Sequence, residues 1–190
     1  MGSAILVGVV VSLALLALQV RLTNRAGSSE QVKAVIATVR PEAWHFVALE
    51  YGNGILNRTH IVFVTEHVMA GACVRGTLPA PMVVTERWHD PYFYPRPVLV
   101  AKYRHIHLES PEFIDMNRAN FHLRREQVKD VEFTTEPKWG MGKVPYSGRL
   151  MLSLEDGVKK ELILLGTQNG PDLRDRLRAG GFGGRGVRQE

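Results

Sequence analysis

Residues 147–179 constrain the fold of this chain more than any other stretch, because they predict two strands, a tight turn and a short helix in direct succession. Leu150, Leu152 and Leu154 occupy every second position of the first strand. Side chains on a strand alternate between its two faces, so these leucines face a core. The chain is therefore expected to contain a sheet that ends in a hairpin.

The turn of this hairpin is predicted from the strand register. A three-residue turn at residues 155–157, with its glycine in the left-handed position, pairs Leu154 with Val158 and leaves only Lys160 on the apolar face. The aliphatic stem of that lysine can reach outward at a rim. A two-residue Asp-Gly turn would instead set Lys159 opposite Leu154. The three-residue turn is therefore favoured.

A short helix is expected directly after the hairpin. Asn169 or Gly170 is placed to cap it, and Pro171 falls in its first turn, where a missing N–H costs little. Leu173 and Leu177 lie four residues apart and form a narrow apolar stripe. A helix this short is not stable alone in water, so it is expected to dock on the sheet.

Runs rich in β-branched and aromatic residues, bounded by turn residues, predict further strands upstream of the hairpin. These runs are residues 59–65, 67–76, 82–88 and 97–108, and two more within 120–136 that a polar crossing separates.

The segments before the first of these strands are expected to be helical. Val32, Val35, Ile36 and Val39 are spaced like one face of a helix. Residues 41–52 are expected to form a second helix, with a proline in its first turn and a glycine near its end.

Three phrases in this pattern resemble a pleckstrin-homology-like barrel. They are "VFVTEHVMAGACVRG", "NFHLRREQVKDVEF" and "GRLMLSLEDGVKKELIL", and the resemblance covers residues 59–178. It implies an α+β, mainly β fold, with a barrel of about seven antiparallel strands and a C-terminal helix. The domain is expected to cover residues 32–178, including its helical N-terminal segment.

The same resemblance implies a scaffold that binds lipids, peptides or partner proteins without catalysis and without a cofactor. Phosphoinositide binders of the family place Lys and Arg in the first hairpin and its loop. Here that region offers only Arg75, and the nearby loop "GTLPAP" is uncharged. Phosphoinositide recognition at the usual site is therefore not expected.

The apolar run at residues 3–20 predicts one transmembrane helix in front of the domain. It holds 18 residues without charge or proline, which as a helix reach roughly 27 Å, close to the hydrocarbon thickness of a bilayer. A cleaved signal peptide is the alternative for the same residues. No basic residue precedes the run and no clean A-x-A site follows it, so a retained anchor is favoured.

The charges that flank this run predict the orientation of the chain. Arg21 and Arg25 follow the run, and basic flanks tend to stay in the cytoplasm. We therefore expect a single-pass membrane protein with a linker at residues 21–31 and its domain on the cytoplasmic side. The single cysteine, Cys73, agrees with this side, because a disulfide-stabilised exported domain would need pairs. On that orientation the sequon at Asn57 has no glycosylation role.

Composition narrows the remaining classes. The formal net charge is +5, but basic and acidic side chains interleave across residues 120–165 rather than forming the basic face of a nucleic-acid binder. No nucleic-acid partner is expected. The Gly- and Arg-rich end, residues 179–190, is expected to be a disordered tail.

An aromatic loop is the candidate binding site. The segment "ERWHDPYFYPRP" crowds four rings between prolines: Trp88, Tyr92, Phe93 and Tyr94. Such a loop either forms an exposed binding edge or lies at a membrane interface, or it folds back as a cover over the barrel mouth. The first alternative requires these rings to be exposed.

A metal site is the candidate for catalysis. His105, His107 and Glu109 would share one face of a strand that includes residues 97–108, with a further ligand from His89, His122 or Asp90. Exposed histidines on a polar strand face are the simpler interpretation. The leading hypothesis is thus a membrane-anchored, non-catalytic protein- or lipid-interaction module, and the alternative is a membrane-anchored metal-dependent enzyme that uses these two histidines.

Overall fold

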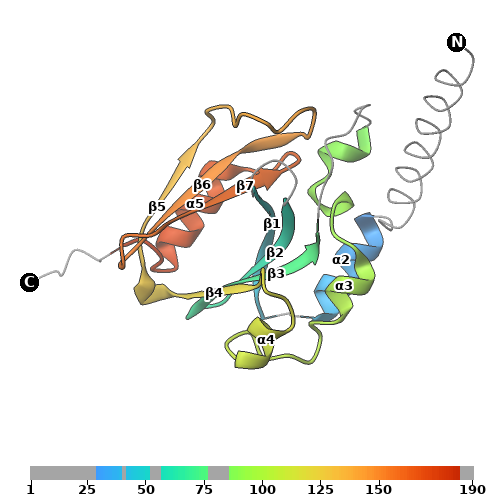
Figure 1. Cartoon of the computed structure of the whole chain (residues 1–190), viewed down its shortest axis with the longest axis horizontal. Helices are drawn as coiled ribbons and strands as arrows, with labels where there is room; N and C mark the ends of the chain where they lie inside the picture. The colour runs from blue at the N-terminus through green and yellow to red at the C-terminus, as the bar shows by residue number, and fades with distance from the viewer. Residues whose placement is uncertain (1–28, 40–41, 52–56, 77–85, 185–190) are drawn as a thin grey trace, which may run out of the picture.

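The computed structural model describes residues 29–39, 42–51, 57–76 and 86–184 (Figure 1). In that part of the chain seven antiparallel strands form one sheet in the order β4-β3-β2-β1-β7-β6-β5. The strands are β1 (Trp44–Glu50), β2 (Arg58–Val64), β3 (Val68–Arg75), β4 (Phe121–Arg124), β5 (Val128–Thr134), β6 (Tyr146–Leu154) and β7 (Lys159–Leu165).

The sheet curls into a half-barrel, and a C-terminal helix, α5 (Gly170–Ala179), packs against β5 and β6 (Figure 1). The remaining described helices are α2 (Ser29–Val39), α3 (Pro97–Ala101), α4 (Pro111–Asp115) and the short 3-10 helices η1 (Glu86–His89), η2 (Pro91–Phe93) and η3 (Arg125–Gln127). The mainly β fold, the antiparallel strands and the C-terminal helix confirm the prediction from sequence.

The predicted hairpin is confirmed in its register. The N–H of Leu154 donates to the carbonyl of Val158 at 2.8 Å, and Gly157 has φ +85°, as the three-residue turn requires. Lys160 lies on the apolar face opposite Leu152. Its ammonium is 2.9 Å from Glu50 Oε1 and 4.0 Å from the centroid of the Phe121 ring, so a carboxylate and an aromatic face stabilise it at the rim.

Helix α5 begins and docks as predicted. Asn169 caps it, with its side-chain oxygen accepting from the N–H of Asp172 at 3.2 Å, and Pro171 follows in the first turn. Leu177 is fully buried and Leu173 is partly buried against the same core. The narrow apolar stripe therefore holds the helix on the sheet.

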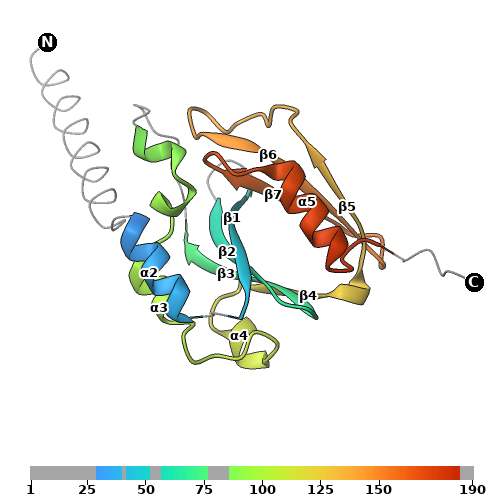
Figure 2. The ribbon, with the colours of Figure 1, turned by 180° about the vertical axis from the view of Figure 1, so that it is seen from behind.

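The sheet carries a core on each face. Phe46 and Ala48 of β1 pack on the inner face of the half-barrel, beneath α5, whereas Val47 and Leu49 pack on the outer face. The outer face of β1–β3 is covered by α2 and by the excursion between β3 and β4 (Figure 2). Every residue of β3 is buried as a result.

Two segments differ from the prediction. Residues 41–52 were expected to form a helix, but β1 runs through them, because its side chains fill two cores alternately and a helix would present only one stripe. Residues 97–108 were expected to form a strand, but they form α3 and turns. Pro97 occupies the first turn of α3 and removes an N–H that a strand would need.

Of the predicted strand at residues 82–88, residues 86–88 lie in η1, and the rest lies outside the described residues. The other predicted strands are present as β2, β3, β4 and β5, with η3 as the polar crossing. The helix predicted from the spacing of Val32, Ile36 and Val39 is confirmed, since all three are buried. It begins at Ser29, inside the segment expected to be linker.

The C-terminal segment also differs from the prediction of a disordered tail from residue 179. Residues 180–184 are folded, and the Phe182 ring is fully buried in the inner core. Its N–H donates to the carbonyl of Leu177, and the next N–H, of Gly183, donates to Val128 of β5. The prediction failed because the glycine-rich composition indicated disorder, whereas the single aromatic residue Phe182 anchors the segment in the core. Residues 185–190 lie outside the described residues.

The predicted transmembrane helix at residues 3–20 also lies outside the described residues. Within the part of the chain that the structure describes, none of the helices has both the length and the apolar character needed to cross a bilayer.

Candidate binding groove between β5 and α5

The aromatic loop is packed rather than free. Tyr94 is fully buried and Trp88 is 9% exposed, and the Tyr94 hydroxyl donates to the Trp88 carbonyl at 3.0 Å. Tyr92 and Phe93 are partly buried against the outer core. The exposure that a binding edge would need is absent from Trp88 and Tyr94. The loop folds back, as in the second alternative, although it covers the outer face of the sheet and not the barrel mouth.

Burial also shifts the pKa values of the ionisable side chains in and behind this loop. Burial raises the pKa of the Tyr94 hydroxyl well above its ordinary range. Arg75, the basic residue that the sequence offered for a phosphoinositide site, is 4% exposed and donates to the Tyr94 carbonyl at 3.0 Å. Burial lowers the pKa of this guanidinium to about 10, which still leaves it charged at neutral pH. Arg75 therefore stabilises the aromatic loop through a buried hydrogen bond to its backbone.

The predicted metal candidates do not share a strand. His105 and His107 are exposed and lie in the turns between α3 and α4. The ring of His107 accepts from the N–H of Glu109 through Nδ1 at 3.3 Å. In the ranges that the structure describes, no three His, Cys, Asp or Glu side chains gather closely enough to hold a metal ion.

Cys73 is also part of the packing. Burial raises the pKa of its thiol, and its sulfur donates weakly to the carbonyl of Arg75 at 3.6 Å. A raised pKa favours the neutral thiol over the nucleophilic thiolate. Cys73 behaves as a small buried hydrophobic side chain.

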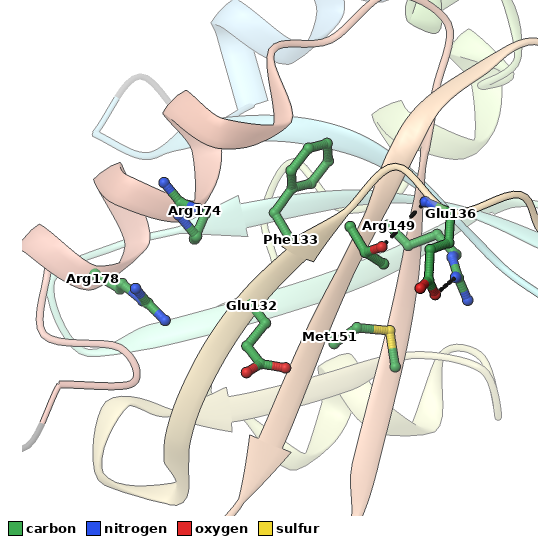
Figure 3. A pocket seen from close by; sticks show the side chains of 8 residues that line it. Glu132, Phe133, Glu136, Arg149, Met151, Arg174 and Arg178 are labelled. Carbon is green, nitrogen blue, oxygen red and sulfur yellow. Dashed lines mark hydrogen bonds and ion pairs between the residues drawn. The ribbon is translucent and has the colours of Figure 1, made fainter.

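A groove outside the predicted sites lies where α5 meets β5 and β6 at the edge of the sheet. Its volume is about 560 Å³. Figure 3 places Arg174 and Arg178 of α5 opposite Glu132 and Phe133 of β5. The lining residues are Glu132, Phe133, Thr134, Glu136, Arg149, Met151, Arg174 and Arg178.

One wall of the groove is a sheet edge. β5 ends the strand order, so no described strand pairs with its second side. Gly183 reaches the first half of this side, donating to the Val128 carbonyl at 3.1 Å, and the Val131 N–H donates to the Asp130 carboxylate at 2.8 Å. Along a strand, the N–H and C=O groups of successive residues point to opposite sides, so residues two apart point to the same side. The N–H and C=O of Phe133 therefore point away from β6, as those of Val131 do. Among the described residues of the tail, none donates a backbone hydrogen bond to the edge beyond Val131.

The ring of Phe133 closes one end of the groove. It lies against two glycines, and a Cβ on Gly148 or on Gly170 would come within 2.5 Å of its atoms. Gly148 belongs to β6 and Gly170 begins α5, so the two glycines let strand and helix approach the same ring. The half-buried ring therefore sets the spacing between the sheet edge and the helix.

Several charged side chains of the groove are paired within the protein. Arg178 donates to Asp130 at 3.0 Å, and Arg149 donates to Glu136 at 3.2 Å and to Glu161 at 2.8 Å. Burial alone would raise the pKa of Glu161, but hydrogen bonds from Lys138 and Arg149 outweigh it and lower that pKa. A surface of alternating, internally balanced charges suits a peptide better than a multiply charged phosphate.

This groove could not be located from the sequence, because it exists only where the end of the chain docks beside an edge strand. The signals that were present are the alternation in "VEFTTE" and the single aromatic residue within "GGFGG".

No protein-family model matches this chain, and the comparisons with curated proteins and with solved structures return no match.

Proposed function

We propose that this chain is a single-pass membrane protein that presents a non-catalytic, pleckstrin-homology-like interaction domain on the cytoplasmic side. The groove between β5 and α5 binds an extended segment of a partner protein. The observation that carries this proposal is the edge of β5 at Phe133, with which no described strand pairs, beside a helix wall that bears Arg174 and Arg178.

An extended segment suits such an edge because its backbone can add to the sheet as a further strand. Main-chain hydrogen bonds then supply affinity, and pockets for alternate side chains supply specificity. Phe133 offers an apolar contact, and the guanidinium groups of Arg174 and Arg178 can exchange their present partners, Asp175 and Asp130, for an acidic side chain of the ligand.

A phosphoinositide is a poorer fit for the domain. Arg75 is buried behind the aromatic loop, and the loop between β1 and β2, residues 51–57, holds no Lys or Arg. Multiply charged headgroups need several cations in reach at once. A protein segment is therefore the better candidate of the two ligand classes that the resemblance implies.

Two features support the family and the anchor. The curled antiparallel sheet in the order 4-3-2-1-7-6-5, followed by one helix, is compatible with a pleckstrin-homology-like barrel. The uncharged run at residues 3–20, followed by Arg21 and Arg25, supports a retained span with the domain inside.

The groove is tested by selecting peptides from a displayed random library with the full-length chain in detergent. Selected peptides are then titrated against Phe133→Ala, which keeps the edge N–H, and Phe133→Pro, which lacks it. Both variants lose the ring, so their difference isolates one backbone hydrogen bond, which corresponds to roughly three- to tenfold in affinity.

Val158→Ala, at an exposed site on the hairpin turn, is the matched control and should bind normally. Peptides that bind Phe133→Pro and the native chain equally would contradict the proposed groove. The same would follow if the library yields no binder.

A further inference from the structure

Trp139 is the most exposed of the large apolar side chains in the described residues, at 91%. It lies in the loop between β5 and β6, whereas Trp88 is buried and Trp44 is partly buried in the inner core. Leaving an indole in water forgoes a large amount of apolar burial. A ring in this position therefore indicates a contact that the isolated domain does not make.

The neighbours of Trp139 keep the ring outside. The N–H of Lys138 donates to the Tyr146 hydroxyl at 2.7 Å, and its ammonium pairs with Glu161 at 2.5 Å. On the other side Met141 is 4% exposed and packs in the outer core. With its two neighbours held in this way, Trp139 projects into solvent from an anchored part of the loop.

The loop lies on the same side of the domain as the N-terminal end of α2. In Figures 1 and 2 the loop between β5 and β6 is at the top, and the N-terminal end of α2 points toward that side. Residues 21–28 connect α2 to the predicted span, and eight residues reach at most about 30 Å. The domain is therefore held close to the bilayer surface.

We propose that Trp139 inserts into the headgroup region of the bilayer that holds the N-terminal span, giving the domain a second membrane contact. The inference rests on the membrane anchor of the proposed function. Indole rings favour this interface because they are apolar and carry one N–H donor. The exposed Lys143 in the same loop suits anionic headgroups.

The test uses the full-length chain reconstituted into vesicles of phosphatidylcholine and phosphatidylglycerol, with and without brominated acyl chains. Bromine quenches only indoles that enter the bilayer. Native chain is compared with Trp139→Phe, which keeps Trp44 and Trp88, so the difference in emission belongs to Trp139. We expect brominated lipid to remove most of this difference.

Flotation of the same vesicles separates the two proposals. A chain that floats, with a Trp139 signal that bromine leaves unchanged, overturns the second contact and leaves the anchor intact. A Trp139 signal that remains accessible to a water-soluble quencher would place the ring in water and also overturn it. A native chain that does not float overturns both the anchor and this contact.

Discussion

The protonation of His60 is controlled by the complete burial of its ring. The ring is 0% exposed, and Nε2–H donates to the carbonyl of Ala119 at 2.9 Å. Nδ1 is buried and has no hydrogen-bond partner among the described residues. Burial lowers the pKa of this imidazole to about 4, with the nearby cations Lys160 and Arg58 acting in the same direction and Glu50 opposing them. A proton on Nδ1 would have no acceptor.

The stability of the fold should therefore fall in mild acid. The unfolded chain binds a proton at this histidine below about pH 6.5, but the folded chain resists it until about pH 4. Stability from this group is complete above pH 6.5 and is lost as the pH falls toward 4, by up to about 3 kcal/mol. Urea unfolding of the full chain in detergent at several pH values measures this loss. His60→Gln keeps a donor for Ala119 without titrating, and an unchanged pH slope in that variant would contradict the assignment.

At the scale of elements, local signals succeeded where the chain pairs with its near neighbours. The hairpin of β6 and β7 followed from alternation and one glycine, and α5 followed from its cap and leucine stripe. β1 and the segment after Pro97 were predicted wrongly. β1 is buried on both faces of the sheet, and the segment after Pro97 packs on the outer core as part of the excursion between β3 and β4. The spacing of apolar residues within each segment does not reveal these distant contacts. The binding groove could not be predicted from the sequence, because it also depends on contacts between separate segments of the chain.

The turn of the β6–β7 hairpin offers a clean test of backbone strain. Gly157 has φ +85° and open space around its Cβ position, so Gly157→Ala should cost about 1 kcal/mol or slightly more from conformation alone. Gly76→Ala is the matched control, because it is equally uncrowded and lacks a positive φ. Thermal or urea unfolding measures both variants. Equal stability of the two would show that the left-handed turn does not exist.

At the scale of the whole molecule, one sheet separates two cores. Tyr94 fills the outer core and Phe182 the inner core, and both rings are fully buried. The strands β1–β3 carry side chains into both. Neither core is complete without the shared strands, so the two should unfold together.

Truncation of either ring should therefore shift one common transition. Tyr94→Ala and Phe182→Ala should each cost about 3–5 kcal/mol, because each removes a buried aromatic side chain. Val98→Ala, where the side chain is 74% exposed, should change stability by less than about half a kcal/mol. Calorimetry of the full chain distinguishes the cases, and two separate transitions in either variant would contradict the shared sheet.

Orientation is the remaining property of the whole chain. A reporter that is active only in the cytoplasm, fused after Glu190, should be active, because Arg21 and Arg25 follow the predicted span. Replacing both arginines by glutamate is expected to weaken this preference. Activity of a reporter that works only outside the cytoplasm would reverse the assignment.

The pairing of β1 also has a consequence for synthesis on the ribosome. β1 pairs with β2, which follows it closely, and with β7, where Ala48 meets Leu164 near the end of the chain. Translation at ~5–20 residues per second delays β7 by on the order of ten seconds. During that delay β1 carries an unpaired edge, so a second nascent chain nearby can compete for it. Ribosome spacing on the message should therefore affect how much of this protein reaches its native fold.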